Sequence, residues 1–77
     1  MDINLADVTL HIDETLPHEE RENVADAIRG IEGVVAVASH DERPHLMVVE
    51  YDPNRTSSQE ILSSVKGAGF HAELVGL

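Results

Sequence analysis

Two periods of apolar residues, one of a strand and one of a helix, organise the first half of the sequence. In ADVTLHID, residues 6–13, apolar and polar residues alternate, which predicts a strand with one face in solvent. The next segment carries apolar residues at the spacing of a helix, with Pro17 in its first turn and its end between Gly30 and Gly33. This predicted helical stripe comprises Val24, Ala27, Ile28 and Ile31.

The second half predicts a hairpin, a helix and a last strand. VVAVAS and HLMVVEYD are rich in β-branched residues and read as paired strands, joined by a longer loop, HDERP, that Arg43-Pro44 keeps out of the strand. In TSSQE, either Thr56 with Gln59 or Ser57 with Glu60 forms a capping box. The stripe of the helix that follows comprises Ile61, Leu62, Val65 and Ala68. After the glycines of KGAG, FHAELVG predicts a final strand, and this passage echoes RGIEGVVAV.

The order of elements is therefore strand, helix, strand, strand, helix, strand. It predicts an α+β, ferredoxin-like βαββαβ sandwich, with a four-stranded antiparallel sheet in the order 4-1-3-2 and both helices on one face. Besides the two helical stripes, the predicted core comprises Val8, Leu10, Ile12, Val34, Val37, Met47, Val49, Tyr51, Ala72 and Leu74.

Composition narrows the function classes. We interpret the 77 residues as one small domain, residues 1–77. The absence of cysteine excludes disulfides, thiolate metal sites and a cysteine nucleophile. A net charge of −10 disfavours nucleic acid and anionic membranes and favours cations or basic protein surfaces. With no leader pattern and no apolar run of membrane-spanning length, we expect a cytoplasmic protein.

Three segments together resemble the heavy-metal-associated domain of copper chaperones and metal-pumping P-type ATPases. They are IEGVVAV, VVEYDP and VKGAGFHAELV, and the resemblance covers almost the whole chain. In that family an M-x-C-x-x-C loop after the first strand binds Cu(I), Zn(II) or related ions. Its methionine position falls here on Thr15 and its cysteine positions on Pro17 and Glu20, so both thiolate ligands are missing. Cu(I) needs soft sulfur donors, and only Met1 and Met47 carry sulfur, so we expect no Cu(I) binding by thiolates.

The predicted topology brings the histidines to one end of the molecule. These residues are His11, His18, His40, His45 and His71. Imidazole with carboxylate is a donor set for a divalent transition metal such as Zn(II), Ni(II), Co(II) or Cu(II). The first candidate site pairs His11 with His71 and adds Asp13, and the competing site uses His18 and Glu20.

The acidic stretch DETLPHEERE, residues 13–22, has a simpler interpretation. Carboxylates favour the positive end of a helix dipole, and Pro17 wastes no hydrogen bond there, so the stretch reads as the start of the helix. Carboxylates beside the histidines are also expected to raise the pKa of the imidazoles, which would make a contact at this end sensitive to pH.

The face of the sheet away from the helices predicts an association surface. Val35, Leu46, Val48 and Val75 point to that face and form an apolar patch rimmed by acids. Its occupant is a second copy of the chain or a partner protein with a basic surface.

No residues combine into a nucleophile with a base and an oxyanion site, so we expect no enzyme activity and no required cofactor. The sequence favours a protein-binding adaptor, with a divalent-metal carrier or sensor as the alternative.

Overall fold

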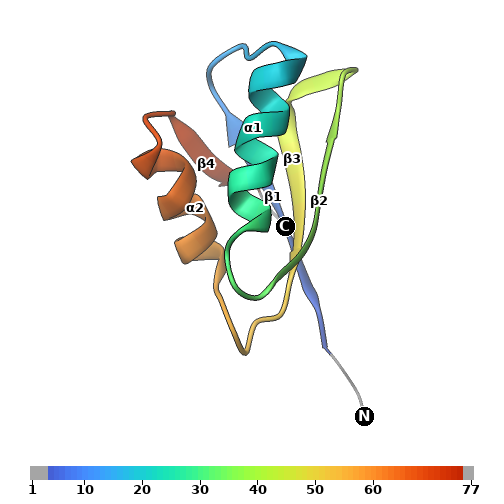
Figure 1. The fold of residues 1–77 in the computed structure, drawn as a ribbon, viewed down its shortest axis with the longest axis vertical. Coiled ribbons are helices and arrows are strands. Elements are labelled where there is room, and N and C mark those ends of the chain that lie inside the picture. Colours follow the sequence, from blue (N-terminus) through green and yellow to red (C-terminus); the bar gives the residue numbers. More distant parts are fainter. Residues whose placement is uncertain (1–3, 76–77) are drawn as a thin grey trace.

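The computed structural model describes residues 4–75, and its elements follow the predicted order (Figure 1). Met1, one of the two sulfur-bearing residues, and Gly76, the last residue of the predicted final strand, lie outside the described residues. The elements are β1 (Ala6–Ile12), α1 (His18–Arg29), β2 (Val34–His40), β3 (Arg43–Tyr51), α2 (Ser58–Gly67) and β4 (Ala72–Val75).

The four strands form one antiparallel sheet in the order β2-β3-β1-β4, which is the predicted order. Both helices lie on the same side of the sheet, where α1 packs on β2 and β3 and α2 packs on β4 (Figure 1). The ferredoxin-like sandwich with one uncovered sheet face is therefore confirmed.

The core lies between the helices and the sheet. Its most buried side chains come from β1, β3, α1 and α2, and those on the strands alternate as predicted. Burying each such side chain fully contributes about 1.5–3 kcal/mol, so this layer supplies most of the stability of a chain without disulfides. The buried hydrophobic residues are Leu10, Ile12, Leu16, Val24, Ala25, Ile28, Val37, Met47, Val49, Ile61 and Val65.

The buried face of α1 has a different phase from the predicted stripe. The buried residues are Arg21, Val24, Ala25 and Ile28, so Ala27 was wrongly placed in the core and is exposed. The buried stripe begins at Arg21, about one turn before Val24, the first apolar residue of the helix. A stripe that starts there includes Ala25. Ala68, predicted in the stripe of α2, is also exposed, because the helix ends at Gly67 and Ala68 is its C-cap.

The predicted loop between β2 and β3 was too long. β3 begins at Arg43 and includes Pro44, so only Asp41 and Glu42 form the turn. The register shifts between Ser39 and His40, and Pro44 falls within the irregular stretch of β3. A strand accepts a proline at such a bulge, because no ladder N–H is needed there.

A second register shift explains why Val34 and Val37, an odd number of residues apart, both face the core. The ladder shifts between Val34 and Ala36, which leaves Val35 at the irregularity and 56% exposed. Single extra residues of this kind reverse the inward and outward alternation of a strand.

The two helices begin differently. Ser57 is the N-cap of α2, and its side chain accepts a hydrogen bond from the backbone of Glu60, 3.1 Å away. This is the second of the two predicted caps. The Glu60 carboxylate accepts a hydrogen bond from the Thr56 hydroxyl instead of reaching back to Ser57. For α1, Pro17 is the N-cap and Glu19 and Glu20 stand in the first turn, which confirms that the acidic stretch leads into a helix.

Two glycines with positive φ lead into strands at equivalent points of the two halves. Gly33 (φ 102°) precedes β2, and Gly69 (φ 101°) lies between α2 and β4. A Cβ at Gly33 would lie 2.9 Å from Cβ of Arg55, whereas one at Gly69 would meet no atom within 4 Å. The echo between the two segments thus reflects a shared backbone conformation, and Gly33 alone also allows close packing.

Gly33→Ala and Gly69→Ala are a matched pair that separates backbone strain from steric overlap. Each substitution places a side chain at an unfavourable φ, which costs about 1–3 kcal/mol. Gly33→Ala adds overpacking against Arg55 and Thr56, worth roughly 1–3 kcal/mol more. We expect urea denaturation to show a larger loss of unfolding free energy for Gly33→Ala. Equal losses would contradict the packing role of Gly33.

Candidate functional site

The five histidines gather at the end of the molecule where β1 leads into α1, β2 turns into β3 and β4 begins, at the top of Figure 1. We call this end the histidine pole. Contacts between distant segments hold it together. The Asp13 backbone N–H donates to the His71 carbonyl at 2.8 Å, and His45 Nδ1 lies 2.8 Å from the Ile12 carbonyl oxygen. The predicted convergence of the loops is observed.

One group of three potential metal ligands forms at this pole. His11, Asp13 and Glu73 each offer a ligand atom, and these atoms all lie within 4.8 Å of one another. His11 Nδ1 is 3.2 Å from an Asp13 carboxylate oxygen and 4.0 Å from a Glu73 oxygen. The ladder fixes this arrangement, because His11 lies directly opposite Glu73 in the pairing of β1 with β4. We call these three residues the imidazole–carboxylate cluster.

His71 is not part of that cluster, whereas His11 and Asp13 of the first predicted set are. The register places Glu73 opposite His11, while the His71 ring lies 2.8 Å from Glu14. The His71 backbone N–H also donates to both oxygens of Glu14, at 3.0 and 3.2 Å. The alternation of the last strand places Glu73 on the open face, but it does not give the register of that strand against β1. The sequence therefore could not show that Glu73 lies beside His11.

The Glu14–His71 pair shifts the pKa of both groups. The hydrogen bond between the side chains, with help from the backbone N–H of His71, lowers the pKa of Glu14 below its ordinary 4.5. The same hydrogen bond, followed by the charge of Glu14, raises the pKa of His71 above its ordinary 6.5. The predicted effect of carboxylates on the imidazoles is thus confirmed at His71.

The second predicted site, His18 with Glu20, is also not assembled. His18 Nδ1 lies 3.0 Å from Asp41 in the β2–β3 turn, and Glu20 is an exposed residue of the first turn of α1. Asp41 has a second partner, Arg21, whose NH2 group lies 2.6 Å away. The hydrogen bond from Arg21, and then that from His18, lower the pKa of Asp41 below its ordinary 3.8.

Arg21 fastens the loop before α1 to the β2–β3 turn. Its side chain is 6% exposed, and the guanidinium donates to the carbonyls of Leu16 and His40 as well as to Asp41. This residue was missed by the apolar pattern. The available signal was its position three residues before Val24, on the same helical face.

His45 supports the ring of His11. The two imidazole rings stack with centroids 5.5 Å apart and planes 17° apart. Because a carbonyl oxygen only accepts, His45 Nδ1 carries the proton toward Ile12. The stack limits the positions that the His11 ring can take beside Asp13 and Glu73.

The uncovered sheet face, which we call the open face, carries a row of side chains across all four strands that is apolar except for Thr9, and we call it the apolar row. The register aligns Val75 with Thr9, Thr9 with Val48, and Val48 with Ala38. Val48 and Val75 are 42% and 43% exposed, as predicted, and Leu46 is half-buried. Leu5, just before β1, is a further exposed apolar residue that the pattern missed. The apolar row comprises Val75, Thr9, Val48 and Ala38.

Acidic residues flank the apolar row on both sides. On one side Asp7 pairs with Glu50, and on the other Glu73 lies opposite His11. The open face is therefore apolar along its middle and negative along both flanks.

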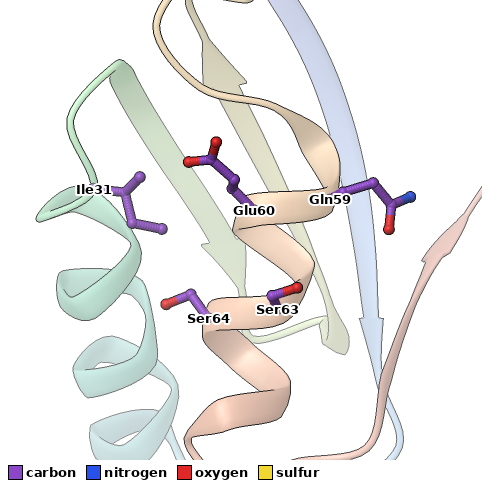
Figure 2. Close-up of a pocket in the computed structure, with 5 residues that line it drawn as sticks. All are labelled: Ile31, Gln59, Glu60, Ser63 and Ser64. Atoms are coloured by element: carbon purple, nitrogen blue, oxygen red, sulfur yellow. The ribbon is translucent and has the colours of Figure 1, made fainter.

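A groove on the opposite side of the molecule lies beside α2 (Figure 2). It is lined by Ile31, Gln59, Glu60, Ser63 and Ser64. Figure 2 shows Ile31 facing α2, whereas Gln59 points to the other side of the helix. The Glu60 carboxylate accepts a hydrogen bond from the Thr56 hydroxyl at 3.2 Å.

Solved structures show what this fold resembles. Oxidized MerP from Ralstonia metallidurans CH34 superposes with a TM-score of 0.84 at 26% identity, over 95% of this chain and 100% of MerP. The N-terminal domain of a potential copper-translocating P-type ATPase from Bacillus subtilis gives 0.83 at 19% identity, over 95% and 90%. The copper binding domain of the P-type ATPase HMA7 gives 0.82 at 20%, over 91% and 93%. No protein-family model matches the chain, and no curated protein matches it in sequence.

The chain thus has the fold of a heavy-metal-associated domain, and it lacks cysteine. The structural neighbours are metal-binding domains and chaperones, and some are N-terminal domains of ATPases. Thr15, Pro17 and Glu20, at the positions of the family's sulfur ligands, are all exposed here. Among the described residues, no helix is long and apolar enough to cross a membrane.

Replacing Arg21 tests whether it fastens the pole. Arg21→Ala removes three hydrogen bonds and leaves acceptors at Leu16 and His40 without a donor. We expect a loss of about 2–4 kcal/mol of unfolding free energy in urea. Arg29→Ala is the control: it removes an ion pair with Asp26 and one hydrogen bond to the Val37 carbonyl, and because the side chain is 42% exposed the loss should be smaller, about 1–2 kcal/mol. A loss at Arg21 no larger than that at Arg29 would show that the buried guanidinium does not hold the pole.

The Glu14–His71 pair predicts a defined pH dependence. A raised His71 pKa stabilises the fold below about pH 6.5, and this contribution is lost as the pH rises through the folded-state pKa. The lowered pKa of Glu14 means that its carboxylate stabilises the fold above about pH 4.5, and this contribution is lost as the pH falls through the folded-state pKa. The pair therefore contributes most between these values. In a pH titration by NMR, Glu14→Gln should return the His71 pKa toward 6.5, and Glu20→Gln should not. An unchanged His71 pKa in Glu14→Gln would exclude the pair in solution.

Proposed function

We propose that this chain is a non-enzymatic protein-binding module, one domain over residues 1–77, that docks a partner protein through its open face. The observation that carries the proposal is the apolar row across all four strands, on the face that no helix covers. Exposed apolar patches rimmed by polar groups are typical of association surfaces. A cytoplasmic location is part of the proposal.

Charge selects the kind of partner. The flanks of the row are acidic, and the whole chain carries a charge of −10. If two copies met with their apolar rows aligned, the Asp7–Glu50 flank of one would face an acidic flank of the other in either orientation. Like charges across an interface are unfavourable, so a second copy fits less well than a partner with an apolar centre and basic edges.

The structural neighbours support a binding role in general terms. They include a copper-binding ATPase domain and a metallochaperone. The thiolates that carry metal chemistry in the heavy-metal-associated family have no equivalent here, whereas the open face offers a surface for association.

Divalent-metal binding is the second candidate function, as a carrier or sensor. It is favoured by a separate observation, the convergence of His11, Asp13 and Glu73. Two of these residues, His11 and Asp13, belong to the first set predicted from the sequence, while His18 and His71 contact Asp41 and Glu14.

Site-specific photo-crosslinking tests the docking face. With a photoreactive benzoylphenylalanine at Val48, we expect adducts in the producing cells with a partner whose crosslinked segment combines apolar and basic residues. Val75→Lys should reduce the yield about tenfold, because it places a charge in the apolar row. Added salt should also reduce it, since the flanking charges are exposed.

Ser63, exposed on α2 and away from the open face, is the control position for the crosslinker. Equal adducts at Ser63 and Val48 would contradict docking on this face. Adducts only between two copies of the chain, with a dimeric mass in light scattering, would replace the basic partner with a homodimer.

A further inference from the structure

The imidazole–carboxylate cluster lies on the open face, and none of its residues occupies a position that the resemblance assigns to a sulfur ligand. We propose that His11, Asp13 and Glu73 form a site for a single divalent transition-metal ion of the Zn(II), Co(II) and Ni(II) class. The site joins β1 to β4 and leaves at least one coordination position open. The proposal goes beyond docking and gives the second candidate function its ligands.

The geometry fits such an ion. With ligand distances of 2.0–2.2 Å and tetrahedral angles, two ligand atoms on one Zn(II) lie roughly 3.4 Å apart. The 3.2 Å between His11 Nδ1 and Asp13 matches this spacing, and the 4.0 Å to Glu73 is slightly longer. Because the Glu73 side chain is 72% exposed, it can close the remaining distance by changing its rotamer.

The backbones of the ligands are already fixed. His11 and Glu73 are paired residues of the β1–β4 ladder, and the Asp13 N–H continues that ladder by donating to His71. The stacked ring of His45, itself bonded to the Ile12 carbonyl, restricts His11 from one side. In metal sites a ligating imidazole is typically held in place by a hydrogen bond to a neighbouring group. Here His45 makes the hydrogen bond and holds His11 by stacking on it.

The two carboxylates of the cluster compete for one imidazole nitrogen. Both carboxylates lie near the same nitrogen, but one Nδ1–H donates well to only one of them, and the shorter distance goes to Asp13. Glu73 then faces a like charge within 4.8 Å. A divalent ion would replace this repulsion with attraction to both oxygens.

The donor set selects the class of ion. One imidazole with two carboxylates suits Zn(II), Co(II), Ni(II) or Fe(II), whereas Cu(I) prefers sulfur. Ca(II) requires six to eight oxygens, and the two carboxylates of the cluster supply too few.

Zn(II) titration of the protein prepared without a polyhistidine tag tests the site. Imidazole ¹⁵N NMR spectra should show a saturable shift at His11 Nδ1 that ends near one equivalent, and excess Ca(II) should not compete. Glu73→Gln and Asp13→Asn should each weaken Zn(II) binding by about tenfold or more. His18→Ala should leave the affinity within about twofold, because His18 contacts Asp41 and not the cluster.

Binding that is unchanged in both Glu73→Gln and Asp13→Asn would overturn the proposal, as would unsaturable shifts spread over all five histidines. All of these substituted side chains are exposed or half-buried, so the variants should fold. Val48→Lys distinguishes this site from the docking face. It should abolish the crosslinks of the docking test, with the crosslinker moved to Thr9, and weaken Zn(II) binding much less than Glu73→Gln does, so each proposal can fail while the other holds.

Discussion

The position of β1 between β3 and β4 is the constraint on which the rest of this structure depends. Its ladders fix three alignments at once: Leu10 with Met47 in the core, Thr9 with Val48 and Val75 on the open face, and His11 with Glu73 at the pole. A slip of one residue would turn every side chain of β1 to the other face. The burial of Leu10 and Ile12, each at most 1% exposed, opposes such a slip. The hydrophobic core therefore also sets the geometry of the polar residues.

The fold was predictable from local patterns, because each element carries its own period and its own boundary. The alternation in β1, the Ser57 cap and the two glycines at positive φ are signals that adjacent residues determine. The site was predictable only in outline. Topology brings His11, His45 and His71 to one pole, but whether Glu73 or His71 lies beside His11 depends on the register between strands about 60 residues apart in sequence. The bulge near Pro44 and the buried face that begins at Arg21 are likewise set by tertiary packing.

The loop between β1 and α1 shows how the pole is held in a chain without thiolates. Glu14 is bonded to His71, and Arg21 joins Leu16 to the β2–β3 turn. These contacts connect the loop to β4 on one side and to the hairpin on the other. The loop is thus fastened by hydrogen bonds and ion pairs within the chain. Thr15 and Pro17, in the same loop, face solvent.

The docking surface and the imidazole–carboxylate cluster share residues of one face, so the two proposed activities are physically linked. Glu73 is both a proposed ligand and part of the acidic flank of the apolar row, two residues from Val75 on β4. An ion bound there would cancel negative charge on that flank while leaving the Asp7–Glu50 flank unchanged. A basic partner would then be attracted less strongly on that side only. Because the coupling of two binding events is reciprocal, the bound partner would weaken ion binding by the same factor by which the ion weakens partner binding. The Debye length is about 8 Å at physiological ionic strength, which exceeds the spacing of neighbouring strands, so the ion would act mainly on the part of the row that lies on β4 and β1. The sign of this coupling reverses for a partner that supplies the open coordination position, because its ligand atom would bind the ion directly.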